Sequence, residues 1–199
     1  GAYEKFAEAD GTVHGAYGPR LLAMRGGVNQ IENVIKILRR KPSSRQAVVQ
    51  LFNAEDLLKD YNDVPCTCTL QYLVRRNALH TIVHMRSNDA FLGLPHDVFA
   101  FTFIQELIAR TLGLRLGTYM HIAGSLHIYD SDKKKVKKYL KEAYQARISM
   151  PRMAVGDPWK NLKKLIAVES KIRQGVNVNI DRYAVPNYWK DLMRLLQVF

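Results

Sequence analysis

Two stretches of the chain repeat apolar residues at the spacing of an amphipathic helix. The first is "NQIENVIKILRRK" (29–41). Its apolar face is formed by Ile31, Val34, Ile35 and Leu38. The second, "DVFAFTFIQELIARTLG" (97–113), has one continuous apolar side and a natural C-terminal cap in Gly113. Three further helical patterns follow at about 131–146, 157–174 and 186–197.

Other stretches have the length and composition of β-strands. "RQAVVQLF" (45–52) reads as a buried strand, and 67–76 with 79–87 reads as a hairpin turning at Asn77. A further strand covers 117–129 and is interrupted at Gly124, where a bulge is expected. Residues 1–27 read as irregular. Strands mixed with flanking helices predict an α+β fold, in a single domain over 1–199.

Composition narrows the class of protein. A chain of 199 residues, 47% of them hydrophobic, suits one domain with a sizeable core. No apolar run approaches the roughly 20 residues that span a bilayer, so we expect no membrane partner. No secretory signal is visible, and two cysteines do not make a disulfide framework. The expected location is the cytoplasm.

The chain is strongly basic, with a formal net charge of +12. Such an excess favours anionic partners, including phosphorylated small molecules and nucleic acid. Part of it is local, because "DKKKVKKYLKEAY" (132–144) carries six lysines on a helical pattern with Val136, Leu140 and Tyr144 as its buried stripe. We interpret it as a solvated helix face. Nucleic-acid binding is the less favoured alternative, because no nucleic-acid motif is present.

Both cysteines lie in "DVPCTCTLQY" (63–72). The spacing of Cys66 and Cys68 is too tight for a zinc knuckle, and no second pair follows, so we expect no metal. A disulfide between them would be strained on an extended strand. A core thiol and a nucleophile remain possible. Cys66 follows a proline where a loop enters a strand, and Arg75, Arg76 and Arg86 are cations that lower a thiol pKa when close.

Five motifs, in order, resemble one family. "VPC" (64–66), "MRSNDAFLGLPHDVFAFTF" (85–103) and "HIAGSLHIY" (121–129) look like the thymidylate synthase and deoxycytidylate hydroxymethylase superfamily, and "HGAYGPRL" (14–21) with "KPSSRQAVVQLFN" (41–53) is similar to two further segments of it. The likeness covers about residues 3–130, and a divergent helical part follows over 131–199. It implies a mixed sheet flanked by helices, with sheets packed back to back in a homodimer.

The resemblance also implies an activity. The family transfers a one-carbon unit from methylenetetrahydrofolate to C5 of a pyrimidine nucleoside monophosphate. The ring carbon becomes nucleophilic after a cysteine thiolate adds to C6, and this residue would be Cys66. Tyr17 matches the tyrosine that helps to remove the C5 proton. No metal is implied.

Binding residues carry over from the same motifs. Arg86 and Ser87 would hold the 5′-phosphate, since a planar cation and a hydroxyl suit a dianion. Arg45 would reach the phosphate of the neighbouring subunit. The remaining assignments are His127 and Tyr129 for the sugar hydroxyl, and Asp89, Tyr3 and Phe6 for the folate.

Asp97 bears on which base is bound. Most thymidylate synthases carry asparagine here, whereas the family's cytidylate hydroxymethylases carry aspartate. A carboxyl group suits cytosine, because it accepts from the 4-amino group and, when protonated, donates to N3. We therefore favour a cytidylate over dUMP, the alternative. Asp97 could also serve as the N-cap of the helix that follows it.

Several positions depart from the family pattern. Gln46, Thr67 and Ser125 replace an arginine, a histidine and an aspartate. The family's N-terminal segment, with a phosphate-binding arginine and a catalytic glutamate, would precede Gly1 and is absent from this sequence. A catalytically reduced nucleotide-binding module is therefore a second alternative.

Overall fold

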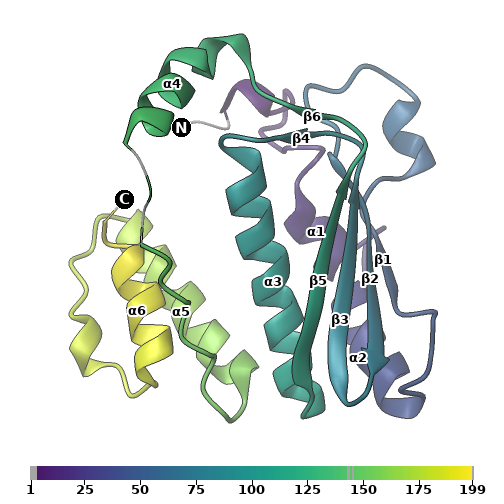
Figure 1. Ribbon diagram of the computed structural model, residues 1–199, viewed down its shortest axis with the longest axis vertical. Coiled ribbons are helices and arrows are strands. Elements are labelled where there is room, and N and C mark those ends of the chain that lie inside the picture. The colour runs from purple at the N-terminus through teal and green to yellow at the C-terminus, as the bar shows by residue number, and fades with distance from the viewer. Residues whose placement is uncertain (1–3, 143, 145, 199) are drawn as a thin grey trace. The chain divides into compact units, whose positions relative to one another are not determined.

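The computed structural model describes residues 4–142, 144 and 146–198 (Figure 1). Its contacts divide the chain into two compact units, Gly1–Ala143 and Tyr144–Phe199, and each is described by itself below. Whether the chain forms a single domain stays a prediction.

A mixed sheet is the centre of the first unit. Its order is β1-β2-β3-β5, with antiparallel pairs β1–β2 and β2–β3 and a parallel pair β3–β5. The strands are β1 Val48–Gln50, β2 Thr67–Arg75, β3 Ala78–Met85 and β5 Arg115–Ala123. A second, parallel pair joins β4 Asn88–Asp89 to β6 Leu126–His127. The β2–β3 hairpin turns on Arg76 and Asn77, both with positive φ, as expected for a two-residue hairpin turn.

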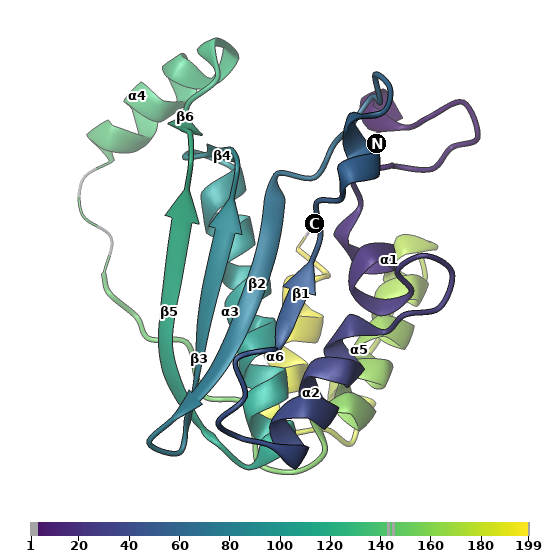
Figure 2. The same cartoon turned by 90° about the vertical axis from the view of Figure 1, so that its right-hand side faces the viewer.

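The helices of this unit lie mainly on one face of the sheet, as Figure 2 shows for α3 behind the strands. They are η1 Glu4–Phe6, α1 Tyr17–Leu22, α2 Gln30–Arg40, η2 Ala54–Leu57, α3 Gly93–Leu112, η3 Asp130–Asp132 and α4 Lys133–Lys141. The predicted α+β class, with a mixed sheet flanked by helices, is confirmed.

Strand register explains why only one face is covered. Directly opposed residues of neighbouring strands share a face. On the face toward the helices the rows are Val49–Leu70–Val83–His121 and Tyr72–Thr81–Tyr119. On the open face one row is Val48–Gln71–Ile82–Met120 and the next ends in Ile122. Val48, Met120 and Ile122 are 43%, 53% and 44% exposed, so this face presents apolar side chains that no described element of the first unit covers.

A buried ion pair joins the start of the chain to the region after β1. Both guanidinium nitrogens Nη1 and Nη2 of Arg20 donate to the carboxylate of Asp56, at 2.8 and 2.7 Å. His14 Nε2 lies 2.7 Å from the same carboxylate, and Arg20 also donates to the carbonyls of His14 and Leu51. Every polar atom of the pair therefore finds a partner, which a buried charge requires.

The second unit is helical. Its elements are α5 Pro158–Arg173, η4 Ile180–Arg182 and α6 Asn187–Leu195. Asp157 caps α5 by accepting from the backbone N–H of Trp159 at 2.9 Å. The core of this unit is Val168, Val178, Ile180 and Met193. The three predicted helical patterns correspond to α4, α5 and α6.

Some boundaries differ from the predictions. Residues 1–27 were expected to be irregular, but α1 lies within them. Helix α3 begins at Gly93 rather than residue 97, so Asp97 lies inside the helix and the N-cap interpretation is wrong. The break at Gly124 is confirmed, because β5 ends at Ala123; a Cβ at Gly124 would lie 3.1 Å from the carbonyl oxygen of Arg86.

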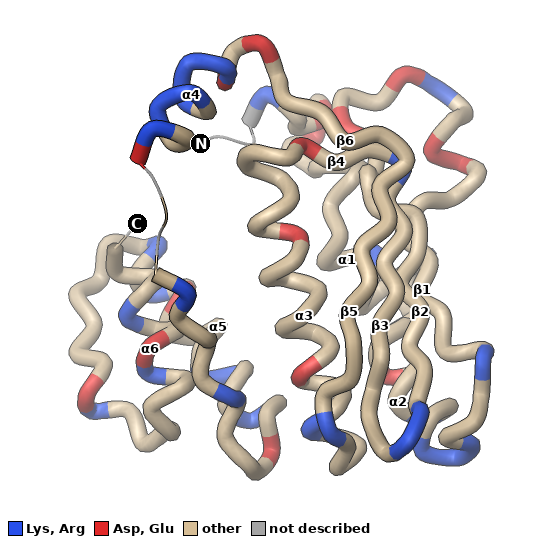
Figure 3. Tube along the Cα trace, in the orientation of Figure 1, with Lys and Arg blue, Asp and Glu red and all other residues tan. Residues whose placement is uncertain are grey.

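Helix α4 differs from its prediction in packing. Its six lysines lie along the exposed helix (Figure 3). The expected buried stripe is wrong, because Leu140 is 71% exposed and Tyr144 fully exposed. Tyr139 makes the ring contact instead, edge-on to Phe91 with centroids 6.4 Å apart. In the described part of the chain, no helix combines the length and apolarity needed to cross a membrane.

Candidate active site

The start of β2 and the end of β3 bring Cys66 and Arg86 together. Thr67 pairs with Met85 in the ladder, and Arg86 N–H donates to the carbonyl of Cys66 at 2.9 Å. The Arg86 side chain folds over the same loop, because Nε donates to Pro65 O at 2.9 Å and Nη2 to Val64 O at 3.0 Å. Nη2 lies 3.8 Å from Sγ of Cys66. The guanidinium is therefore fixed beside a half-buried sulfur.

The protonation of this sulfur reflects two opposing effects. Burial raises the pKa of the Cys66 thiol, and the neighbouring Arg86 lowers it by less, so the pKa stays above the usual 9.0. Asp63 and Asp97 act in the same direction as burial. The resting group is a thiol at neutral pH, and Arg86 favours the thiolate when it forms. Arg75 and Arg76, the other cations considered, line a cavity at the far end of β2.

Thr67, the residue that follows Cys66, holds Tyr17 beside the cysteine. The Tyr17 hydroxyl accepts from Thr67 N–H at 3.2 Å and from Thr67 Oγ1 at 2.9 Å. Burial raises the pKa of Tyr17 to about 12, aided by the nearby charges of Asp97 and Cys66. The phenol therefore keeps its proton at neutral pH. Since its oxygen already accepts two hydrogen bonds, its own O–H remains available to a third group.

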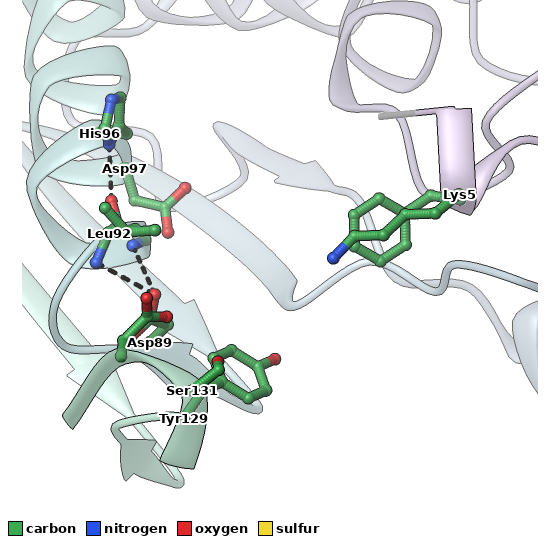
Figure 4. A pocket seen from close by; sticks show the side chains of 10 residues that line it. Lys5, Asp89, Leu92, His96, Asp97, Tyr129 and Ser131 are labelled. Atoms are coloured by element: carbon green, nitrogen blue, oxygen red, sulfur yellow. Dashed lines mark hydrogen bonds between the residues drawn. The ribbon is translucent and has the colours of Figure 1, made fainter. Parts of the chain in front are cut away.

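A cavity of about 640 Å³ lies in front of α3. It is lined by residues that include Lys5, Phe6, Asp89, Leu92, Asp97 and Tyr129. Figure 4 shows Asp89, Asp97 and Tyr129 on one side and Lys5 on the opposite side, with the Asp97 carboxyl directed toward the space between them. Burial raises the pKa of Asp97, and Asn88 partly offsets this by donating from Nδ2 to Asp97 Oδ2 at 2.7 Å.

Asp89 has a structural role that the sequence did not reveal. Its carboxylate accepts from the backbone N–H groups of Phe91, Leu92 and Gly93 at 3.0, 3.0 and 3.2 Å. Burial alone would raise its pKa, but these donors and nearby His127 hold the pKa below the ordinary 3.8. Asp89 thus fixes the start of α3 and still lines the cavity.

The residues assigned to the sugar and phosphate lie along the β4–β6 pair. Ser87 Oγ is 3.4 Å from His127 Nδ1, and the rings of His127 and Tyr129 meet edge to face at 4.9 Å. Ser87 directly follows Arg86 in the chain. The structure therefore brings Ser87, His127 and Tyr129 together, and of these Tyr129 is among the residues that line the cavity.

One expected residue, Arg45, lies elsewhere. Arg45 is exposed and lines a separate cavity of about 550 Å³ with Lys41, Arg75 and Arg76. Its carbonyl accepts from Gln71 Nε2, part-way along β2 and away from Cys66. Within one chain Arg45 does not meet the cysteine. Tyr3 lies outside the described residues, whereas Phe6 lines the larger cavity as expected.

Four polar residues of the site were not predicted: Thr67, Asn88, Tyr119 and His121. Asn88 occupies the variable position of the Arg-Ser-x-Asp motif and touches Asp97. Tyr119 and His121 alternate with exposed residues along β5, a period of two that places both on the covered face. That alternation was the available signal. Among the described residues, no group of three or more His, Cys, Asp or Glu side chains could hold a metal ion.

Comparison with known proteins adds to this geometry. The sequence profile of the family described as thymidylate synthase matches residues 2–177, beyond the stretch of about 3–130 that first suggested the likeness. A thymidylate synthase of Bacillus subtilis subsp. natto is 33% identical over 132 residues, which cover 64% of this chain and 47% of the relative. A thymidylate synthase of Bacillus phage phi3T gives the same identity and coverage. The aligned segment thus spans about half the length of these curated relatives.

Proposed function

This chain belongs to the thymidylate synthase family, and on that premise we propose that it transfers a one-carbon unit to C5 of a pyrimidine nucleoside monophosphate. The observation that carries the proposal is the position of Arg86 Nη2, 3.8 Å from Sγ of Cys66. The same guanidinium uses Nε and Nη2 on loop carbonyls, which leaves Nη1 for a substrate phosphate.

Cys66, Arg86 and Tyr17 have separate roles in the proposed reaction. Sγ of Cys66 bonds to C6 of the ring, and the C5–C6 electron pair moves to C5, which then bonds the one-carbon unit. C5 would next lose its proton as the bond from the one-carbon unit to the folate nitrogen breaks. The resulting exocyclic methylene would take up water to give a hydroxymethyl product, or a hydride from the reduced folate to give a methyl product, while the C5–C6 double bond re-forms and the Cys66 thiolate leaves C6. Arg86 stabilises the thiolate at both ends of this sequence. The Tyr17 hydroxyl, held by Thr67, orients the group or water that receives the C5 proton.

We propose a cytidylate as the preferred substrate. The raised pKa of Asp97 favours its protonated form, which both donates and accepts at the base edge. The curated relatives are named thymidylate synthases, so dUMP is the alternative substrate, with a methyl rather than a hydroxymethyl product.

Methylenetetrahydrofolate is the proposed co-substrate. The cavity fits a flat, partly polar ring, because Phe6 and Leu92 offer apolar surface while Asp89 offers carboxylate oxygens. When bound, it supplies the one-carbon unit. Lys5 lies across the cavity from Asp89, at a place where it can meet an anionic part of the ligand (Figure 4).

Tritium release tests the reaction. We expect release from [5-³H]dCMP or [5-³H]dUMP in the presence of methylenetetrahydrofolate, and loss of that release in Cys66→Ala. Cys68→Ala is the matched control, because Cys68 is a free, half-buried thiol two residues away. Release that persists in Cys66→Ala would contradict the proposal.

Binding tests the base. We expect dCMP to bind more tightly than dUMP, and Asp97→Asn to reverse that preference. Equal or tighter binding of dUMP, unchanged in Asp97→Asn, would leave thymidylate synthesis as the function. Binding of either nucleotide without any release would favour a nucleotide-binding module, the second candidate.

We propose a homodimer formed by the open face of the sheet. That face carries Val48, Met120 and Ile122, each more than 40% exposed. An apolar face of this kind is typical of an interface. Exposed Arg45 would then be free to reach the phosphate site of the second copy. Sedimentation should show a dimer that Met120→Lys dissociates. Leu57→Lys is the control, because it places the same charge at an exposed leucine in η2, and it should leave the dimer intact.

Both cysteines are free thiols, as a reducing compartment would keep them, and we propose the cytoplasm as the location. The exposed lysines of α4 leave nucleic-acid binding the less favoured alternative. A gel shift with steep salt dependence would support it, and no shift at low salt would remove it.

A further inference from the structure

A chain of hydrogen bonds leads from Asp97 into the sheet. Asp97 Oδ2 accepts from Nδ2 of Asn88 at 2.7 Å. Asn88 Oδ1 lies 3.1 Å from Nε2 of His121, and His121 Nδ1 lies 2.7 Å from the Tyr119 hydroxyl. The four residues come from α3, β4 and β5, so the chain connects three separate elements.

The direction of each hydrogen bond follows from the amide. Because Asn88 donates through Nδ2, its Oδ1 must accept, and Nε2 of His121 therefore carries a hydrogen. A neutral imidazole then has Nδ1 as its acceptor, which takes the hydrogen of the Tyr119 hydroxyl. Burial lowers the pKa of His121 and raises that of Tyr119, which favours the neutral ring and the protonated phenol.

The environment holds this arrangement in place. Asn88 is 2% exposed, so its amide is shielded from bulk water. A Cβ at Gly93 would lie 3.3 Å from Asn88 Nδ2, and glycine at this position leaves room for the amide beside Asp97. If the side-chain amide of Asn88 were flipped, Oδ2 of Asp97 and Nε2 of His121 would lose their hydrogen-bond partners, which is costly for buried groups.

These hydrogen bonds make the two carboxyl oxygens of Asp97 inequivalent. A protonated carboxyl is symmetric until its surroundings choose the oxygen that carries the proton. Since Oδ2 accepts from Asn88, the proton of the acid form is placed on Oδ1. Reversing the amide would need the proton on Oδ2 and the other tautomer of His121. The histidine tautomer and the donor oxygen of Asp97 are therefore linked.

We propose that Tyr119 and His121 are positioning residues that determine base specificity, by fixing through Asn88 which oxygen of Asp97 donates to the base. Cytosine and uracil present opposite donor and acceptor patterns at N3 and position 4. A carboxyl with a fixed donor oxygen matches one of them, whereas a carboxyl free to protonate on either oxygen accommodates both. This inference rests on the proposed nucleotide-binding function and holds whichever base is preferred.

Tyr119→Phe is the sharpest test, because it removes one hydroxyl and keeps the ring. We expect the ratio of the two dissociation constants, for dCMP and dUMP, to fall toward one by roughly tenfold, the effect of one hydrogen bond of about 1.4 kcal/mol. The preferred nucleotide should bind more weakly while the other binds equally or better. A merely structural role would weaken both alike and leave the ratio unchanged.

Tyr72→Phe is the matched control. Tyr72 lies in the same row of the same sheet face, opposite Thr81, and its buried hydroxyl has no hydrogen-bond partner among the described residues. Its loss should not change the ratio. His121→Gln is the second variant. A glutamine amide can keep the hydrogen bond to Asn88, but it cannot transmit the donor direction set by the Tyr119 hydroxyl. This variant should also lower the ratio of the two dissociation constants.

Nitrogen-15 spectra of the imidazole give a readout without nucleotide. Wild-type His121 should show a protonated Nε2 and a bare Nδ1, and Tyr119→Phe should give a mixture of tautomers. A single tautomer in both proteins, or an unchanged ratio in both Tyr119→Phe and His121→Gln, would overturn the inference. Wild-type protein that binds neither nucleotide would overturn the proposed function and this inference together.

Discussion

Arg86 and Cys66 are joined twice, through the backbone and through the side chain. The Arg86 N–H donates to the Cys66 carbonyl at 2.9 Å, while Nη2 lies 3.8 Å from Sγ. The β2–β3 ladder thus fixes the cation and the sulfur as one unit. Burial nevertheless outweighs the cation, and the thiol pKa remains raised.

Removing the charge of Arg86 should raise the thiol pKa further. In a Cys68→Ala background, Arg86→Gln should slow alkylation of Cys66 by iodoacetamide at pH 8, on the order of tenfold for a cation lost at this distance. The pH profile of the alkylation rate should shift upward, because a higher pKa leaves less thiolate at any given pH. Arg86→Lys, which keeps the charge, should fall between the two.

Arg75→Gln is the control, since Arg75 lies at the far end of β2 and lines a different cavity. It should leave the alkylation profile unchanged. An Arg86→Gln profile identical to that of wild type would show that the guanidinium does not act on the sulfur.

Thr67 should matter for proton removal rather than for binding. Thr67→Val deletes the Oγ1 donor to Tyr17 and keeps the shape and the backbone N–H donor. We expect tritium release to slow by roughly tenfold, the effect of one hydrogen bond, with the nucleotide dissociation constant unchanged. Thr69→Val, on the open face of the same strand, should change neither. Equal loss of binding and release in Thr67→Val would instead indicate a structural role.

Asp56 should make the stability of the protein sensitive to acid. Although burial would raise its pKa, hydrogen bonds from Arg20, Asn53 and His14 hold the pKa below the ordinary 3.8. A carboxylate with a lowered folded-state pKa stabilises the fold above its unfolded pKa, and this stabilisation is lost as the pH falls through the folded value. Asp56→Asn should therefore lower the free energy of unfolding by about 3 kcal/mol at pH 7, since it leaves Arg20 buried without its charge partner.

Urea titrations followed by circular dichroism at several pH values measure this difference. The gap between wild type and Asp56→Asn should narrow below about pH 4, because the wild-type carboxyl then protonates as well. Glu55→Gln is the control: Glu55 pairs with Arg25 in an exposed bridge, and its loss should cost less than about 1 kcal/mol. A gap that stays constant down to pH 2 would contradict the assignment.

The periodic elements were predictable from the sequence because their burial is one-sided. Helix α2 and the β2–β3 hairpin lie close to their predicted ranges, since each presents one apolar face to the core. The start of α3 was not predictable in the same way. Its true beginning depends on Asp89 accepting from three backbone N–H groups, a local hydrogen-bond pattern that apolar spacing does not record.

The site was predictable where a motif carried it. Cys66 and Arg86 are neighbours in space, as the resemblance implied, and Asp97 faces the cavity. The partners that tune these groups were not visible, because Thr67 acts through Tyr17 of α1 and His121 acts through Asn88 of β4, which are distant from them in sequence. Their roles depend on strand register, which only the folded chain defines.

Met193 offers a way to follow the two units separately. Both tryptophans of the chain, Trp159 and Trp189, lie in the second unit, and both cysteines lie in the first. Tryptophan fluorescence in urea therefore reports the second unit, while protection of the cysteines from a thiol reagent reports the first. Met193→Ala creates a cavity at a fully buried position in the core of the second unit. It should lower the free energy of unfolding measured by fluorescence by about 2–5 kcal/mol.

The cysteine readout then decides how the units are coupled. If the chain is a single cooperative domain, as the sequence predicts, Met193→Ala should shift cysteine exposure to lower urea together with the fluorescence. If only the fluorescence transition moves, the units unfold independently and the single-domain prediction is wrong. Val155→Ala is the control, because Val155 belongs to the second unit but is 90% exposed, and truncating it should move neither transition.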